Sequence, residues 1–550
     1  MRYLALACDY DGTLATHGKV DDETVSALSK FAASGRKLLL VTGRQLDDLL
    51  DISPQIDLFD RVVAENGGVL YRPATKEEKL LAEPPSEQFV NNLRLHGVQP
   101  ISVGRCIVAT WVPHETTVVK VIREMGLELQ VIFNKGAVMI LPAGVNKASG
   151  LRAALAELGL SKHNVVSVGD AENDHAMLKY SECGVAVRNS LPSLIERADF
   201  ATLNDHGAGV SELIDLILKS DLQEVSATIC RHDIPLGTTS DGTIKCLRPF
   251  GTGLLLAGPS GSGKSTTALG IIERLIEAGY QICLIDPEGD YQSVPGAVTL
   301  GNAQKAPTID EIMQLLKKPK ENAVVNLLAL PLDDRPPFFE KLLPHLQDLR
   351  TQKGRPHWLI VDEAHHLLPP LIGPPSPALM RVSGSTMLIT VHPDQVSKAV
   401  LSSLDVVVAV GKDQQATMQN FSRLAGTPIS DGANGGNDEA GNVLAWFKAT
   451  DSGPMSLQVL PTRSERRRHQ RKYAEGDLGG ESFTFQGPEA KLKLRAQNLS
   501  IFLQMAEGVD DETWNFHLRR GDYSRWFRSA IKDEGLAADA EAVEKDERLD

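Results

Sequence analysis

The sequence predicts an α/β protein with two doubly wound parallel-sheet domains and a small helical domain. Three observations predict this architecture. Short apolar runs alternate with amphipathic stretches up to about residue 218, the alternation returns from about residue 253 to 460, and a later segment has a helical pattern. Such alternation is typical of parallel sheets with helices on both faces. At 550 residues, the chain is long enough for three or four domains with separate cores.

Composition narrows the class of protein. Hydrophobic residues make up 42% and charged residues 23% of the chain, as in ordinary globular proteins. The net charge of −14 argues against a broadly basic surface for nucleic acid, although a local basic channel is compatible with it. The six cysteines form no CxxC pair, which argues against a zinc site and favours the reducing cytoplasm. No apolar run is long enough for a membrane span, so we expect no membrane partner.

The first 220 residues have the pattern of one α/β core with an insert. Amphipathic stretches at Asp22–Ala33 and Lys147–Leu158 predict helices between apolar runs. The runs that predict strands are Leu4–Cys8, Lys37–Thr42, Arg61–Ala64 and Val165–Val168. From residue 81 to 141 the alternation gives way to a helix followed by strands, which we interpret as an α+β cap. The core is then residues 1–80 and 142–220.

A second α/β domain is expected over residues 225–460. It opens with the segment Thr238–Thr243, which has the composition of a hairpin turn. The expected strands are Gly253–Ala257, Gln281–Ile285, Ala323–Asn326, Trp358–Val361, Thr386–Val391 and Val406–Val410. The helical pattern Thr266–Ala278 follows the first of these strands, so the order again favours a parallel sheet.

Three shorter segments follow the second domain. Residues 461–490 are expected to be a basic, solvated linker, because the arginines and lysines of Arg463–Lys472 are interleaved with acids. Residues 491–537 are predicted to form a small helical domain whose aromatic side chains pack together. Residues 538–550 are an acidic tail that we expect to fray.

Two acidic residues follow the first predicted strand directly. Asp9 and Asp11 lie in the sequence DYDGT, where a strand ends and a loop begins. Ligands of open α/β sheets bind at such ends. Of two carboxylates in one extended loop, one can attack a phosphorus atom while the other serves as acid and base. Two such charges require a cation, so we expect Mg²⁺, which binds carboxylate and phosphate oxygens.

Four further residues fit the same chemistry. Thr42 ends the second strand with a hydroxyl that can hold a phosphate oxygen, and Lys147 can neutralise the transferring phosphoryl group. Asp170 and Asp174 follow a later strand and can complete a metal shell. The expected catalytic residues are Asp9, Asp11, Thr42 and Lys147. The expected metal ligands are Asp9, Asp11, Asp170 and Asp174.

Taken in order, these motifs resemble those of the haloacid dehalogenase superfamily over about residues 1–215. The Cof-like class is the most similar, since its α+β cap is inserted between the second and third motifs. The resemblance implies a phosphate monoester hydrolase that works through an aspartyl-phosphate on Asp9. It implies that Asp11 is the acid and base and that its backbone carbonyl binds Mg²⁺. The cap would choose the substrate, and its sequence names none.

A second phosphate motif lies in the middle of the chain. The sequence GPSGSGKS at residues 258–265 fits G-x-x-x-x-G-K-[ST], between a predicted strand and a predicted helix. Its glycines let backbone N–H groups face phosphates, Lys264 reaches the β- and γ-phosphate oxygens, and Ser265 binds Mg²⁺. The expected ATP-binding residues are Gly258, Pro259, Ser260, Gly261, Ser262, Gly263, Lys264, Ser265, Thr266 and Asp362.

Two acids end a later apolar strand of this domain. Asp362 is expected to join Ser265 in the Mg²⁺ shell, and Glu363 is expected to polarise an attacking water. A kinase gains nothing from a water-activating glutamate. The pair therefore favours ATP hydrolysis over phosphoryl transfer to a second substrate.

The strings DPEGDY and DEAHHLLP resemble the HerA, FtsK and type IV secretion ATPases over about residues 230–455. The resemblance implies a RecA-like fold and ATP hydrolysis in a ring where an arginine is donated in trans. Arg381 is the candidate for that arginine. The chain departs from the pattern after the strand at 386–391, where the expected polar Gln is missing. Thr390 or His392 can take its place.

Three functions remain open at this point. The leading one is a Mg²⁺-dependent phosphatase joined to an ATPase. A nucleic-acid end-processing kinase–phosphatase has the same pairing of domains, but Asp362 and Glu363 argue against its kinase half. The third is a DNA-translocating ring, assembled as a homo-oligomer through the ATPase domain, with a regulatory phosphatase-like domain. The net acidity of the chain argues against it.

Overall fold

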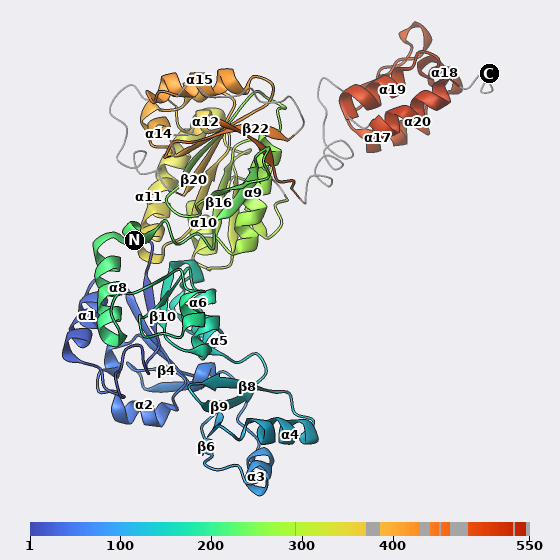
Figure 1. The fold of residues 1–550 in the computed structure, drawn as a ribbon. Helices are drawn as coiled ribbons and strands as arrows, with labels where there is room; N and C mark the ends of the chain where they lie inside the picture. Colours follow the sequence, from blue (N-terminus) through green and yellow to red (C-terminus); the bar gives the residue numbers. More distant parts are fainter. Residues whose placement is uncertain are drawn as a thin grey trace. The chain divides into compact units, whose positions relative to one another are not determined.

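The computed structural model describes residues 1–291, 293–369, 385–429, 441–449, 453–462, 482–531 and 534–545 (Figure 1). The chain divides into two compact units, Met1–Leu460 and Pro461–Asp550. The first unit contains two large sheets with helices on both faces, and the second is mainly helical. The fold is therefore of the α/β class, as the alternation of strands and helices predicts.

An eight-stranded sheet forms the N-terminal part of the first unit. Its order is β12-β11-β10-β1-β2-β3-β4-β5, and β1 pairs in parallel with both β10 and β2. β4 runs antiparallel to β3 and β5, an edge that the sequence did not predict. The strands are β1 (Ala5–Cys8), β2 (Lys37–Val41), β3 (Arg61–Ala64), β4 (Val69–Arg72), β5 (Glu77–Leu80), β10 (Val165–Gly169), β11 (Cys183–Ala186) and β12 (Phe200–Ala201).

Successive residues of β1 enter two different apolar layers. Leu6 and Cys8 pack with α1 and α8 on one face of the sheet, whereas Ala5 and Ala7 pack with α5 and α6 on the other. Burial on both faces explains why the strands are continuous apolar runs. The helices that cover the sheet are α1 (Asp22–Ala33), α2 (Leu46–Ile52), α5 (Lys147–Leu158), α6 (His175–Tyr180), α7 (Pro192–Ile195) and α8 (His206–Ser220).

The insert forms a separate antiparallel sheet with two helices, as the sequence predicts for an α+β cap. Its strand order is β6-β7-β9-β8. The β8–β9 hairpin turns at Lys135 and Gly136, both of which have the positive φ that a tight hairpin requires. The elements are α3 (Glu87–Leu95), β6 (Ser102–Val103), β7 (Val108–Trp111), α4 (Glu115–Met125), β8 (Leu129–Asn134) and β9 (Ala137–Pro142).

An eleven-stranded sheet forms the rest of the first unit, in the order β14-β13-β23-β22-β21-β15-β20-β19-β16-β18-β17. The six strands from β21 through β15, β20, β19 and β16 to β18 are parallel, and β17 continues them at the edge. The strands are β13 (Ile234–Thr238), β14 (Ile244–Leu247), β15 (Gly253–Ala257), β16 (Ile282–Asp286), β17 (Ala297–Leu300), β18 (Asn322–Asn326), β19 (Trp358–Val361), β20 (Thr386–Thr390), β21 (Val406–Val410), β22 (Asn442–Phe447) and β23 (Met455–Val459). The predicted hairpin is β13–β14.

Helices cover both faces of this second sheet as well. Leu254 and Leu256 of β15 pack with α9, and Leu255 and Ala257 pack with α11, α14 and α15. The helices are α9 (Lys264–Ala278), α10 (Ile309–Leu316), α11 (Arg335–Lys353), α12 (Ala364–Leu367), α14 (Lys398–Ser402) and α15 (Gln414–Ala425).

Strands of the two sheets begin at a shared buried contact within the first unit. Glu182, just before β11, accepts hydrogen bonds from Arg2 (2.6 Å), His163 (2.7 Å) and the Tyr280 hydroxyl (3.1 Å). The Tyr280 ring stacks on His163 with centroids 3.8 Å apart. The other ring nitrogen of His163 donates to the Ala278 carbonyl at 2.9 Å. We call Arg2, His163, Glu182 and Tyr280 the Glu182 cluster.

A buried arginine extends this contact. Arg355, shortly before β19, donates to the carbonyls of Gly159 and Lys317, each at 3.0 Å, and to the Gln281 side chain at 3.0 Å. Asn164, just before β10, donates to the Gly354 carbonyl at 3.4 Å. Because these residues precede β10, β16 and β19, the contact joins the N-terminal ends of strands from both sheets.

The second unit has an aromatic core. Phe485, Phe502, Tyr523, Trp526 and Phe527 are buried together, as predicted from the aromatic residues of this segment. A two-stranded hairpin accompanies the helices and was not predicted. The elements are β24 (Phe483–Phe485), β25 (Leu494–Ala496), α17 (Leu499–Ala506), α18 (Asp511–Leu518), α19 (Asp522–Trp526) and α20 (Glu534–Glu544).

The helical segment extends beyond its predicted end at residue 537. α20 continues to Glu544, because its alanine-rich sequence favours helix, Ala537 is buried, and Glu541 pairs with Arg528 at 2.9 Å. The predicted fraying at residues 538–550 is therefore wrong as far as Glu544. The basic run Arg463–Lys472 lies outside the described residues. Within the described part of the chain, no helix is both long and apolar enough to cross a bilayer.

Candidate active sites

The predicted nucleophile lies at the carboxyl end of the central strand of the first sheet. Asp9 follows β1, Thr42 follows β2, and Asp170 follows β10, and these strands are neighbours. The carboxyl ends of parallel strands meet at one edge, so these residues lie at one site. Asp9, Thr42 and Asp170 are all buried. The structure thus brings together three residues that are far apart in the sequence.

Lys147 is the central cation of this site. Its ammonium donates to Asp9 at 2.5 Å and to Asp174 at 2.7 Å, and its side chain is 1% exposed. Asn146 caps α5 by accepting from the N–H of Ser149, which fixes Lys147 in the first turn of the helix. Burial opposes the charged form of Lys147, but Asp174 and Asp9 together raise its pKa above the ordinary value.

The acidic residues suit a divalent cation. Oxygens of Asp9, Asp170 and Asp174 lie within 4.8 Å of one another. Burial and the neighbouring carboxylates raise the pKa of Asp9 and of Asp170, even though Lys147 and Lys135 act in the opposite direction. The three acids outnumber the two lysines, so the site keeps a surplus of buried negative charge, and its hard oxygen donors fit Mg²⁺.

Asp174 differs from the other two acids because one of its oxygens accepts from backbone N–H groups. One accepts from Lys147, and the other accepts from the backbone N–H groups of Asp170 and Ala171, each at 3.0 Å. Asp170 instead accepts from the Thr13 hydroxyl at 3.1 Å. Asp174 thus holds both Lys147 and the loop after β10 in place.

Asp11 does not point toward Lys147 but is held by an arginine. Arg44 Nε and Nη2 donate to the two oxygens of Asp11, each at 2.6 Å. Arg44 lies beside Thr42, whose hydroxyl accepts from its backbone N–H at 3.2 Å. Hydrogen bonding to Asp11 raises the pKa of Arg44 further above its ordinary range. The predicted acid and base is therefore in a two-point ion pair.

A lysine from the cap reaches into the same site. Lys135, at the turn of the β8–β9 hairpin, donates to Asp170 at 2.5 Å. A Cβ on Gly12 would lie only 2.5 Å from the Lys135 ammonium and 2.4 Å from an Asp170 oxygen. Gly12 also has a φ of +84°, so glycine is required there both for space and for conformation. The cap thus contributes a cation directly over the DYDGT loop.

Sequence reasoning did not identify Arg44 or Lys135. Arg44 directly follows the Thr42-Gly43 pair, and that proximity to an expected phosphate ligand was the available signal. Lys135 had no local signal, because its role depends on how the cap folds over the core.

The second predicted site lies at the carboxyl end of β15. Gly263 precedes α9 with a φ of +97°, and a Cβ on Gly258 would lie 2.1 Å from the Val410 carbonyl. Lys264 is buried and donates to the Pro259 carbonyl at 2.8 Å, so the loop curls around its own lysine. Burial lowers the pKa of Lys264. This geometry suits a loop whose N–H groups bind phosphates.

Acidic residues from two other strands lie beside this loop. Asp362 follows β19, and burial, with Glu363 and Asp286 nearby, raises its pKa well above the ordinary value. Asp286 ends β16 and accepts from the N–H groups of Asp290 (3.0 Å) and Tyr291 (2.8 Å), and burial raises its pKa to about 6. This surplus of buried negative charge fits the Mg²⁺ expected with a nucleotide.

Glu363 has an unusual backbone and a free oxygen. Its φ is +41°, and its Oε2 is buried with no hydrogen-bond partner among the described residues. Burial and Glu288 raise the pKa of Glu363. A positive φ at a non-glycine residue that carries an unpaired carboxylate oxygen suits a group that binds a reacting water.

The strand between β15 and β19, β20, ends in Thr390, one of the two residues expected to take the place of the missing Gln. Thr390 ends β20, and its hydroxyl lies 3.1 Å from Nδ1 of His365, which is 3.3 Å from Oε2 of Glu363. The hydroxyl also accepts from the N–H of His392 at 3.0 Å. Burial lowers the pKa of His365 to about 4, so its ring is neutral near pH 7. Of the two candidates, Thr390 is linked to Glu363 through His365. Arg381 lies outside the described residues.

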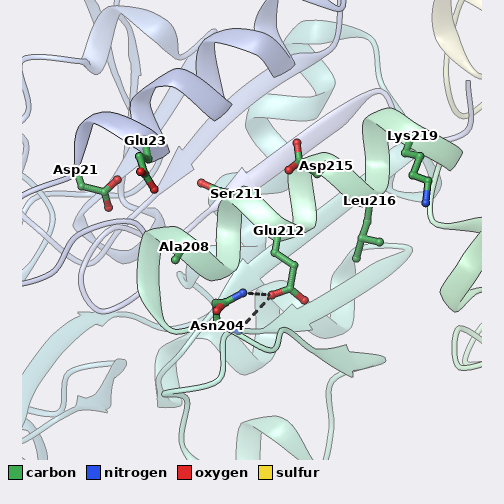
Figure 2. Close-up of a pocket in the computed structure, with 9 residues that line it drawn as sticks. All are labelled: Asp21, Glu23, Asn204, Ala208, Ser211, Glu212, Asp215, Leu216 and Lys219. Atoms are coloured by element: carbon green, nitrogen blue, oxygen red, sulfur yellow. Dashed lines mark hydrogen bonds between the residues drawn. The ribbon is translucent and has the colours of Figure 1, made fainter.

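A pocket of about 500 Å³ lies elsewhere, over α1 and α8 (Figure 2). Asp21, Glu23, Glu212 and Asp215 give it an acidic lining that would repel a phosphate ester. Asp21 caps α1, and Glu212 accepts a hydrogen bond from Asn204 at 2.8 Å. Since these carboxylates stabilise the fold, we assign this pocket no catalytic role.

Known proteins match the first domain closely. A family model described as a haloacid dehalogenase-like hydrolase matches residues 6–99 and 120–214. A phosphoglycolate phosphatase of Methanothermobacter thermautotrophicus is 31% identical over 220 residues, which are 38% of this chain and 96% of that protein. The chain belongs to the haloacid dehalogenase-like hydrolases. Phosphoglycolate phosphatase 2 of Saccharolobus solfataricus is 29% identical over 228 residues, 40% of this chain and 94% of that protein.

The second domain has its own match. A family model described as an AAA domain matches residues 251–387, which confirms the expected P-loop ATPase domain. A crystal structure of a haloacid dehalogenase-like hydrolase from Bacteroides thetaiotaomicron, which resembles the first domain, is 18% identical, covers 39% of this chain and 99% of that protein, and has a TM-score of 0.35.

The two family matches together show a hydrolase that combines a phosphatase domain with a P-loop ATPase domain.

Proposed function

We propose that the chain is a cytoplasmic, Mg²⁺-dependent phosphomonoester hydrolase that works through an aspartyl-phosphate on Asp9 and also hydrolyses ATP. The observation that carries this proposal is the buried contact of Asp9 with Lys147 at 2.5 Å, beside Asp170 at the carboxyl edge of the sheet. A carboxylate so placed can attack phosphorus, and the fixed ammonium can stabilise the negative charge that develops.

The chain's own residues account for both halves of the reaction. An Asp9 oxygen forms a bond to phosphorus while the bond from phosphorus to the ester oxygen breaks. Asp11 gives its proton to the leaving oxygen. Asp11 then removes a proton from a water whose oxygen attacks phosphorus, which releases phosphate and restores the Asp9 carboxylate. Asp9 and Asp170 would hold Mg²⁺, which when bound offsets the charge of the phosphoryl oxygens.

In the second domain, we propose that the residues 258–266 bind the phosphates of ATP, with Ser265 and Asp362 as ligands of its Mg²⁺. Glu363 accepts a proton from the water that attacks the γ-phosphate. Its unpaired, buried Oε2 supports this role. His365 supports it by lying 3.3 Å from the same carboxylate oxygen, and Thr390 is linked to that carboxylate only through His365.

The relatives suggest where a search for substrates should begin. Two of them are named phosphoglycolate phosphatases, so phosphoglycolate is the first substrate to test. A screen should cover phosphoglycolate, sugar phosphates, nucleotides and 3′-phosphorylated DNA, each with and without ATP. We expect a small phosphomonoester to be cleaved in a Mg²⁺-dependent reaction.

The matched variant for this screen is Lys264→Ala, which should abolish ATP turnover and leave phosphatase activity largely intact.

Radiolabelled ATP with a 5′-hydroxyl oligonucleotide tests the kinase–phosphatase alternative. Free phosphate alone is the expected result, whereas label on the oligonucleotide would overturn the ATPase assignment. DNA-stimulated ATP turnover by hexamers would favour the translocating ring instead.

A further inference from the structure

Glu65 connects the core of the phosphatase domain to its cap. The residue directly follows β3 and is buried, and its carboxyl oxygens accept hydrogen bonds from three successive residues of the cap. The donors are the backbone N–H groups of Arg105 (3.0 Å), Cys106 (2.7 Å) and Ile107 (3.2 Å), in the turn between β6 and β7. Neither half of the proposed reaction uses this carboxyl group.

The turn that contains Glu65 has two successive residues in the left-handed region. Glu65 has a φ of +51° and Asn66 a φ of +53°, which costs energy at residues other than glycine. The N–H of Glu65 donates to the Arg44 carbonyl at 2.8 Å, and the N–H of Asn66 donates to the Thr42 carbonyl at 2.9 Å. The strained turn thus fixes Glu65 against the loop that carries Thr42.

The cap turn fits closely around this carboxyl group. A Cβ on Gly104 would lie 2.7 Å from a Glu65 oxygen, so glycine is needed there for space. On the core side, a Cβ on Gly68 would lie 2.6 Å from the Cβ of Cys106. The Cys106 thiol donates to the Gly68 carbonyl at 3.3 Å. The two turns are therefore in direct contact around Glu65.

The cap contacts the core at opposite ends of its sheet. The pairing of β7 with β9 places the β6–β7 turn at one end and the β8–β9 turn, with Lys135, at the other. Between the two ends, Met139 of β9 approaches the core, since a Cβ on Gly43 would lie 3.0 Å from the Met139 Cε. The sheet thus lies across the phosphate site between Glu65 and Lys135.

Ionic and amide contacts near the β6–β7 turn are more exposed than the contact of Glu65. Arg105 pairs with Asp47 at 2.9 Å, but the Asp47 side chain is 77% exposed. Gln45 donates to Ser102 at 2.8 Å, again at the surface. Such exposed contacts contribute little to the position of a domain. Glu65 is therefore the buried side-chain anchor at this end of the cap.

We propose that Glu65 is a positioning residue that holds the cap sheet over the phosphate site and thereby keeps Lys135 beside Asp170. This inference rests on the proposed phosphatase function, because Lys135 assists the reaction only if a phosphate ester binds there. Glu65 takes no part in bond formation or proton transfer. Its loss should free the β6–β7 turn, let the sheet tilt and withdraw the Lys135 ammonium.

Hydrogen–deuterium exchange tests the contact without any substrate. In the unmodified protein, the amides of residues 105–107 should exchange slowly, because they donate to Glu65. In Glu65→Gln, an amide group that cannot accept from them replaces one oxygen, so exchange should be roughly tenfold faster. Peptides from β1 and β10 should be unchanged, which would show that the core is intact. Equal exchange of residues 105–107 in both proteins would overturn the proposal.

Kinetics with p-nitrophenyl phosphate test whether Glu65 acts through Lys135. We expect Glu65→Gln to raise KM roughly two- to fivefold with little change in kcat, because about one hydrogen bond to the phosphate is lost. Lys135→Gln should have an effect of the same size. The double variant should be no worse than the more impaired single variant, since Glu65→Gln already displaces Lys135. If the two effects multiply, or if kcat falls while KM stays the same, the proposal is wrong.

A variant on the cap side perturbs the same contact without changing the core. Gly104→Ala places a methyl group against the Glu65 oxygens and should cause the same changes in exchange and KM. Normal exchange and a normal KM in this variant would contradict the proposal. The control is Glu83→Gln, an exposed acid, which should change neither quantity. If the unmodified enzyme cleaves no phosphate ester, the proposed phosphatase function fails, whereas exchange at residues 105–107 still decides whether Glu65 holds the cap.

Discussion

The two phosphate sites of the first unit balance their charges in different ways. In the phosphatase site, Asp9, Asp11 and Asp170 each contact a cation from the chain, namely Lys147, Arg44 or Lys135. In the ATP site, Lys264 instead donates to the Pro259 carbonyl, while buried Asp286 and Asp362 have raised pKa values. The first site is thus largely neutralised by its own residues, whereas the second depends on a ligand and its metal for neutralisation.

The largest expected effect tests whether the two sites are chemically separate. Asp9→Asn should lower hydrolysis of p-nitrophenyl phosphate by at least about 1,000-fold, because the attacking oxygen is lost. ATP turnover should stay close to that of the unmodified enzyme. The control is Asp57→Asn, an exposed carboxylate of the same domain. If Asp9→Asn still cleaves the ester at the normal rate, the nucleophile assignment is wrong.

The next effect concerns the ATP site. Glu363→Gln should reduce ATP turnover by roughly 100- to 10,000-fold, because the water loses its proton acceptor. Nucleotide binding, measured with a fluorescent ATP analogue, should persist, since Lys264 and the loop are unchanged. Loss of binding instead would mean that Glu363 supports the loop rather than the water. Phosphatase activity serves as the internal control.

A smaller effect tests the contact that joins the two halves of the first unit. Glu182→Gln should lower the free energy of unfolding by about 3–5 kcal/mol, because Arg2 and His163 then lose a buried anionic partner. Calorimetry should show one transition for the first unit, moved to lower temperature. Glu196→Gln, an exposed acid of the same domain, should have little effect. If calorimetry shows two separate transitions, and Glu182→Gln changes the temperature of neither, the cluster has no structural role.

The pH dependence of this effect follows from the pKa of Glu182. Burial alone would raise that pKa, but His163 and Arg2 lower it below its ordinary range. A carboxyl group with a depressed pKa in the folded state adds stability above its unfolded pKa, near 4.3, and loses it as the pH falls. The difference between Glu182→Gln and the unmodified protein should therefore be full at pH 7 and shrink below about pH 4.

The smallest effect concerns the lysine of the cap. Lys135→Gln should raise KM roughly two- to fivefold for phosphoglycolate and for 2-hydroxyethyl phosphate alike, because a half-exposed ammonium contributes modestly to binding of the shared phosphate. The control is Lys120→Gln, an exposed lysine of α4. A change in the ratio of the KM values for the two substrates would contradict this role of Lys135.

The sequence predicted the elements whose pattern is local. The helices Asp22–Ala33 and Lys147–Leu158 have the predicted bounds, because each has a clear apolar stripe and a capping residue. The antiparallel strand β4 was missed because its apolar run is short and bounded by the turn at Gly67 and Gly68. A capping residue or a motif is visible within a few positions of sequence, whereas a sheet edge depends on distant pairing.

Residues of the candidate sites were likewise predictable only where they belong to a local sequence pattern. Residues at fixed positions after apolar strands, such as Asp9, Asp170 and Lys264, could be placed from the sequence, because parallel strands align their carboxyl ends. Lys135 and the Glu182 cluster could not, because they depend on contacts between segments that lie 19 or more residues apart and share no motif.

The Glu182 cluster also lies at the end of both sheets that is opposite the candidate sites. β10, β16 and β19 all begin beside it and run away from it for four or five residues, about 15 Å, before they reach Asp170, Asp286 and Asp362. The two candidate sites therefore lie at the strand ends that are remote from this shared base. We expect phosphate or nucleotide released at one site to reach the other through solvent. A direct coupling of the two sites would have to pass through these short strands and the buried contacts at their base.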